Sequence, residues 1–156
     1  MKSMVYAALY PQAEHRLLMQ PVAPVKHMQT GNDILIVDDE VAIAQLLADV
    51  LHEEGYRIRV AHDGASALLE IIKRRPGLVL LDVAMPVMLG SDLLVYLRQH
   101  GFNDLPIIIM TAGLSPLIYL AQGATEVLPK PFDVNKVVEK IAQYLPLERG
   151  RAAGDE

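Results

Sequence analysis

Four short aliphatic runs, each followed at once by polar residues, constrain this chain more than any other feature of its sequence. They lie at residues 34–37, 78–81, 106–110 and 125–128. Runs of this length and composition are typical of strands buried on both faces of a sheet. The residues that follow them include three aspartates, a threonine and a lysine.

The remaining periodic segments complete an alternation of strand and helix. Residues 56–61 alternate apolar and basic side chains, as an outer strand with one wetter face does. Apolar residues recur at helical spacing in five segments, at residues 43–51, 67–72, 93–97, 114–122 (a short one) and 134–145, where Asp133 suits the N-cap of the last. This alternation predicts an α/β fold with a parallel sheet and helices on both of its faces.

The length of 156 residues suits one domain, which we expect at residues 33–146. Residues 1–32 hold three prolines without a sustained period, and we expect a flexible N-terminal extension there. Residues 147–156 form a polar tail. Ten residues cannot hold a further domain, so we expect a stand-alone unit, although a fragment of a larger protein also suits the sequence.

Composition argues against several functional classes. The net charge of −5 does not favour nonspecific nucleic-acid binding, and the absence of cysteine excludes disulfides and thiolate metal sites. No apolar run approaches the roughly 18 residues of a membrane span. We therefore expect a cytoplasmic protein that binds neither membranes nor nucleic acid directly.

Carboxylates follow two of the predicted central strands. Asp38 and Asp39 come just after the first strand, and Asp82 comes just after the third. The carboxyl ends of parallel strands share one edge, so these acids should converge and repel one another. A divalent cation would relieve that repulsion, and oxygen ligands without a neighbouring His or Cys favour Mg²⁺ over Zn²⁺. Thr111 and Lys130 follow the fourth and fifth strands and should reach the same edge.

Each of these residues has an ordinary explanation when it is taken alone. The Asp38–Asp39 pair could cap a helix, Asp82 could belong to a turn, Thr111 could cap a strand end, and Lys130 could be a solvated lysine. Their joint placement after four separate strands favours a site for a cation and a phosphoryl group instead.

The motifs carry a resemblance to a known family. Residues 34–40, 80–86, 110–112 and 128–132 read ILIVDDE, LLDVAMP, MTA and LPKPF. With these motifs, the stretch 33–145 resembles the receiver domain of bacterial two-component response regulators. The resemblance implies a flavodoxin-like, doubly wound (βα)5 sandwich with the parallel strand order 2-1-3-4-5.

The resemblance also implies a role for each site residue. Asp82 would accept a phosphoryl group from a histidine kinase or phosphotransfer protein. Asp38, Asp39, Asp82 and the backbone carbonyl of Ala84 would hold Mg²⁺. Lys130 and Thr111 would contact the phosphoryl oxygens, and the Lys130–Pro131 peptide bond would be cis.

Some positions depart from the family pattern. Val127 stands where an aromatic residue is usual, with Tyr119 as a candidate substitute, and the segment between Thr111 and Lys130 is short. Leu89 replaces the common aspartate before Gly90, which we interpret as a harmless change in the turn.

Three functions compete. The first is a phosphorylatable receiver that signals through an unknown downstream protein, with a homodimer through residues 114–145 as a further expectation. The second is a receiver-like module that binds proteins without phosphorylation. The third is a phosphohydrolase, which would need a second acid where Ala84 stands, so we expect no enzyme acting on an external substrate.

Overall fold

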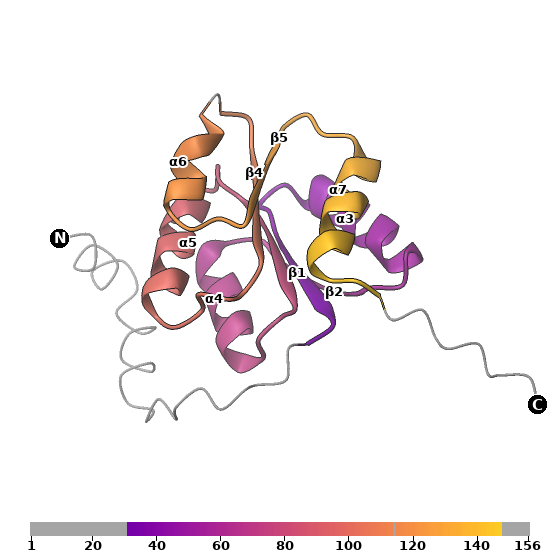
Figure 1. The fold of residues 1–156 in the computed structure, drawn as a ribbon, viewed down its shortest axis with the longest axis horizontal. Helices are drawn as coiled ribbons and strands as arrows, with labels where there is room; N and C mark the ends of the chain where they lie inside the picture. Colours follow the sequence, from indigo (N-terminus) through magenta and orange to yellow (C-terminus); the bar gives the residue numbers. More distant parts are fainter. Residues whose placement is uncertain (1–30, 114, 148–156) are drawn as a thin grey trace, which may run out of the picture.

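A five-stranded parallel sheet in the order β2-β1-β3-β4-β5 forms the centre of the structure (Figure 1). The strands are β1 Asp33–Val37, β2 Arg57–Ala61, β3 Leu78–Asp82, β4 Ile107–Thr111 and β5 Glu126–Pro129. This computed structural model describes residues 31–113 and 115–147. The predicted fold class and strand order are confirmed, whereas nearly all of the predicted extension and tail lies outside the described residues.

Helices cover both faces of the sheet, as Figure 1 shows. They are α3 Val41–Glu53, α4 Gly64–Lys73, α5 Gly90–Gln99, α6 Pro116–Ala121 and α7 Val134–Tyr144. The helices α3 and α7 pack on one face, and α4, α5 and α6 lie on the other. In the part of the chain that the structure describes, no helix is long and apolar enough to cross a membrane.

The three central strands explain the aliphatic runs. Every residue of β1, β3 and β4 is buried. Successive side chains in a strand point to opposite faces, so Leu35 and Leu81 join the core under α4 and α5, while Ile34 and Leu80 join the core under α3 and α7. Aliphatic residues are therefore needed at consecutive positions, and the strands form a rigid base for their carboxyl ends.

Local signals set the ends of several helices. Asp133 caps α7 as predicted, accepting a hydrogen bond from the backbone N–H of Asn135 at 2.9 Å. Gly55 has a φ of 103° just after α3, a conformation that glycine adopts without steric cost. The helix α6 has only six residues and buries none of them, in agreement with the short helix predicted there.

The outer strand β2 differs from its predicted pattern. Arg59, assigned to the wetter face, is largely covered because its guanidinium bridges the strand to α4. It donates to the Asp33 carboxylate at 2.6 Å, to the Glu70 carboxylate at 3.1 Å, and to the backbone carbonyls of Glu70 at 3.0 Å and Arg74 at 2.8 Å. The buried Asp33 carboxylate explains why a charged side chain lies inward here.

Candidate functional site

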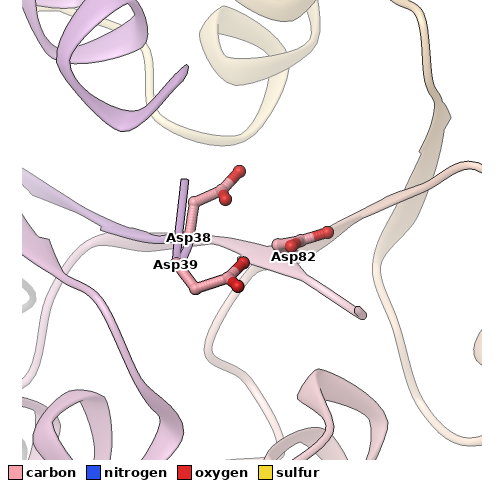
Figure 2. A group of neighbouring side chains, drawn as sticks. All are labelled: Asp38, Asp39 and Asp82. Atoms are coloured by element: carbon pink, nitrogen blue, oxygen red, sulfur yellow. The ribbon is translucent and has the colours of Figure 1, made fainter. Parts of the chain in front are cut away.

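Asp38, Asp39 and Asp82 converge at the carboxyl edge of the sheet. One carboxylate oxygen from each lies within 4.8 Å of the others. Figure 2 shows the Asp39 carboxylate extending toward Asp82. The acids converge because of the register of β1 and β3, which pairs Val37 with Leu81. Asp38 and Asp82 thus follow paired residues of adjacent strands.

The cluster combines two buried acids with one that reaches solvent. Asp38 and Asp82 are 0% and 2% exposed, and Asp39 is half-buried. Asp38 Oδ1 accepts a hydrogen bond from the Glu40 backbone N–H at 2.9 Å, but Asp38 Oδ2 is buried without a hydrogen-bond partner among the described residues. An acceptor with this surplus capacity can bind a cation.

Lys130 is the cation that the fold itself supplies to this cluster. Its Nζ lies 3.1 Å from Asp82 Oδ1 and 3.5 Å from Asp38 Oδ2. The backbone N–H of Lys130 donates to the Thr111 carbonyl at 2.7 Å, and the Lys130–Pro131 peptide bond is cis, as predicted. The turn after β5 thus aims Lys130 at the acids.

The charges of this site are incompletely balanced. Burial raises the pKa of Asp82, the hydrogen bond from Lys130 lowers it in part, and the charge of Asp38 raises it again. Burial acts to lower the pKa of Lys130, but its hydrogen bond to Asp82 and the charges of Asp82 and Asp38 outweigh burial, so this pKa is raised. One lysine therefore does not neutralise the cluster, and additional positive charge would be favourable.

Thr111 and Ala84 border the acids. Thr111 ends β4 one residue beyond Met110, which pairs with Asp82. Its side chain is buried, and its Oγ1 accepts a hydrogen bond from the Gly113 backbone N–H at 3.0 Å. Ala84 is exposed in the loop that leaves β3. The structure thus brings all six predicted site residues to one edge of the sheet.

The family assignment rests on sequence comparison as well as on this geometry. A sequence model of the response regulator receiver domain matches residues 34–142. The chain belongs to this receiver family. The transcriptional regulatory protein CpxR of Escherichia coli is 41% identical over 117 residues, which are 73% of this chain and 49% of CpxR. The chain therefore spans about half the length of this curated relative.

Two smaller relatives match over nearly their whole length. Sporulation initiation phosphotransferase F of Bacillus subtilis is 40% identical over 118 residues, covering 74% of this chain and 94% of the relative. The chemotaxis protein CheY4 of Vibrio cholerae superposes with a TM-score of 0.67 at 32% identity, covering 74% of this chain and 99% of that structure. The receiver fold is thus found both alone and within longer regulators.

Two features of this receiver were not predicted from the sequence. The Nδ1 atom of the exposed His62 lies 2.9 Å from the Asp38 carbonyl, and it must carry the proton because a carbonyl only accepts. Val87, in the loop after Asp82, has a φ of 68°, which is unusual for a β-branched residue. The His62 contact leaves no local sequence signal, since it joins two separate segments. Nothing in the structure explains the positive φ of Val87.

Proposed function

We propose that this receiver accepts a phosphoryl group on Asp82 from a histidine kinase or a phosphotransfer protein. The observation that carries the proposal is the convergence of three carboxylates within 4.8 Å, with Lys130 Nζ 3.1 Å from Asp82. Phosphoryl transfer depends on positioning and charge neutralisation. The clustered carboxylates would hold a cation beside Lys130, and these two positive charges would neutralise the phosphoryl oxygens next to Asp82.

The donor set suits Mg²⁺. Asp38, Asp39 and Asp82 offer only carboxylate oxygens, and the backbone carbonyl of Ala84 would add a further oxygen ligand. Hard oxygen ligands with one side open to solvent are typical of Mg²⁺, which keeps several of its waters. When bound, the ion would supply the positive charge that gathers and polarises the phosphoryl oxygens.

The residues divide the transfer among them. A carboxylate oxygen of Asp82 attacks phosphorus, an O–P bond forms, and the P–N bond of the donor phosphohistidine breaks with its electron pair going to the imidazole nitrogen. Lys130 compensates the charge of Asp82 before transfer and that of the phosphoryl oxygens afterwards. The Thr111 hydroxyl would then donate a hydrogen bond to a phosphoryl oxygen. This new bond would draw the loop after β4 inward and change the nearby surface.

A phosphorylation assay tests this proposal. We expect the full chain, incubated with a small-molecule phosphodonor and Mg²⁺, to gain the mass of one phosphoryl group. Asp82→Asn should gain none, and chelation of the metal should slow the reaction of the wild-type chain. A product that persists unchanged in Asp82→Asn would assign the phosphoryl group elsewhere and overturn the role of Asp82.

A module that binds proteins without phosphate is the second candidate, and one substitution favours it. Val127 packs half-buried against the core cluster at the position where the family usually has an aromatic residue, so this position offers no aromatic ring to respond to phosphorylation. Tyr119 is half-buried against the same cluster and is the candidate substitute, which would instead favour the first function. If the phosphodonor gives no product and Asp82→Asn binds partners as the wild type does, this second function is the better one. In neither function does the chain turn over an external substrate.

The output surface would lie on α6, β5 and α7. Leu117 and Ile118 on α6 are 75% and 54% exposed, which makes this helix an apolar contact for a downstream protein or a second copy. We assign the receiver domain to residues 33–146, as the match over residues 34–142 supports.

A further inference from the structure

Residues 62–64, which are the connection between β2 and α4 together with the first residue of α4, contact the segments that carry both sides of the acid cluster. On one side, His62 donates to the Asp38 carbonyl at 2.9 Å. On the other, Gly64 lies against Met88 in the loop that follows Asp82. We propose that residues 62–64 act as a brace that positions Asp38 and the Asp82 loop for the cation. This inference rests on the proposed function.

The contact between Gly64 and Met88 leaves no room for a side chain. A Cβ atom on Gly64 would lie 2.8 Å from Met88 Cγ and 3.1 Å from Met88 Cβ, and closer still to its sulfur. Met88 is only 3% exposed, so its side chain has no free space outside the core to move into. A methyl group at position 64 must therefore displace the buried Met88 side chain, including its Cβ, which is attached directly to the backbone of the loop.

The loop between Asp82 and Met88 is tight enough to transmit such a displacement. The Met88 N–H donates to the Pro86 carbonyl at 2.7 Å, and the Gly90 N–H donates to the Val83 carbonyl at 3.0 Å. A Cβ on Gly90 would lie 2.9 Å from the Asp82 carbonyl carbon, so the start of α5 packs closely against the Asp82 backbone. A displacement of Met88 would therefore shift the loop that carries the Ala84 carbonyl and follows directly on Asp82.

The brace is itself held firmly at both ends. Asp63 caps α4 through hydrogen bonds from the Ser66 N–H at 2.7 Å and the Ser66 hydroxyl at 2.8 Å. Before the brace, the Ala61 carbonyl accepts from the Asp38 N–H at 3.1 Å. Because the connection is fixed in this way, it can set the distance between the two segments that it contacts.

Titration of the full chain with Mg²⁺ by isothermal calorimetry tests the brace. We expect Gly64→Ala to weaken Mg²⁺ binding about 10-fold, the lower end of effects seen for residues behind metal ligands. Gly77→Ala is the control, since its Cβ would collide with the Gly31 carbonyl oxygen and would lie 2.8 Å from Leu145 Cδ1, at the opposite end of β3 from the acids. This control should lose thermal stability while its Mg²⁺ affinity stays that of the wild type.

A second substitution distinguishes positioning from general destabilisation. Met88→Ala in the Gly64→Ala background makes room for the new methyl group, and Mg²⁺ affinity should return toward that of the wild type. Equal affinities of Gly64→Ala and Gly77→Ala, or no recovery in the double variant, would overturn the brace.

His62→Ala keeps the test decisive if Gly64→Ala does not fold. His62 is exposed, so its replacement leaves the core intact. We expect weaker Mg²⁺ binding from the loss of the bond to Asp38, and unchanged binding would refute the role of His62. Failure of the wild type itself to bind Mg²⁺ would count against the proposed function instead.

Discussion

Replacing Asp82 by Asn should stabilise the metal-free protein, although it removes the proposed phosphoacceptor. The reason is that burial and the neighbouring acids together disfavour the charge of Asp82 more strongly than Lys130 favours it. At a separation of 4.8 Å, the upper bound within the cluster, each carboxylate pair costs about 3.5 kcal/mol at an effective dielectric constant of ~20. The attraction between Lys130 and Asp82 at 3.1 Å is about 5 kcal/mol on the same scale.

Repulsion from Asp38 and Asp39 together therefore exceeds the attraction by about 2 kcal/mol. Burial of Asp82 adds to the cost of its charge, which agrees with the raised pKa of this carboxyl group. Asparagine keeps the shape and accepts a hydrogen bond from Lys130, but it carries no charge. For a domain of this size, a gain of about 2 kcal/mol corresponds to a rise in Tm of roughly 8 °C.

Thermal unfolding followed by circular dichroism in EDTA measures the effect. The matched control is Asp104→Asn, because Asp104 is an exposed acid paired with Arg75 at 3.0 Å and its pKa is lowered, so its charge is favourable. We expect Asp82→Asn to raise Tm and Asp104→Asn not to raise it. A lower Tm for Asp82→Asn in EDTA would show that Lys130 already neutralises the cluster, and the case for a cation would weaken.

The same pair of proteins has a predicted pH dependence. A raised pKa in the folded state means that ionised Asp82 costs stability above that pKa, and that the cost disappears as the pH falls through it. The gap in Tm between Asp82→Asn and the wild type should therefore narrow as the pH falls from 7 toward the ordinary aspartate pKa near 3.9. A gap that widens on acidification would contradict the assigned direction.

Four further predictions concern other residues. Lys130→Ala should leave Mg²⁺ binding in calorimetry largely intact but impair phosphorylation, and loss of Mg²⁺ binding would refute this role. Val87→Gly should raise the free energy of unfolding in urea by about 1 kcal/mol, because glycine adopts the left-handed backbone conformation without the strain of a β-branched residue. The Val87 side chain is 75% exposed, so little packing is lost, and an equal or lower stability would argue against strain. Leu89 is the N-cap residue of α5 but has no side-chain acceptor for the backbone N–H groups of the first turn. Leu89→Asn should therefore raise the free energy of unfolding by about 1 kcal/mol in the same assay. No gain would mean that solvent already satisfies these N–H groups. Arg59→Ala should lower the free energy of unfolding by about 3 kcal/mol, because the buried Asp33 would keep only its ion pair with Arg74. A loss no larger than that of a typical surface substitution would refute the importance of the Arg59–Asp33 pair.

The sheet could be predicted because its signals are local. Aliphatic runs such as 34–37 and 78–81 need only their own composition to be recognised as buried strands, and the polar residue after each run marks its carboxyl end. Parallel topology then brings those ends together, so the convergence of Asp38, Asp39 and Asp82 follows once the strand order is known. The short α6 was also predictable from the length of chain available to it.

Other features depend on contacts between segments far apart in the sequence. Arg59 lies inward because Asp33, on the neighbouring strand, is buried, and an alternating pattern alone cannot reveal such a pair. His62 binds the Asp38 carbonyl across two strand ends, and Gly64 meets Met88 of another loop. The first contact is made to a backbone carbonyl, and the second is possible because Gly64 has no side chain. Neither property can be recognised as a contact from the sequence.

The unfavourable features of the site are supported by the core beneath it. Full burial of one leucine or isoleucine side chain is worth about 1.5–3 kcal/mol, and β1, β3 and β4 bury many of them completely. The excess of repulsion over attraction at Asp82, about 2 kcal/mol, is therefore comparable to a single core side chain. The buried strands β1 and β3 hold the backbones of Asp38 and Asp82 side by side, so these two buried acids remain close together. The most direct relief is a change of charge at Asp82 or a bound cation, and both are events that a signalling site can use.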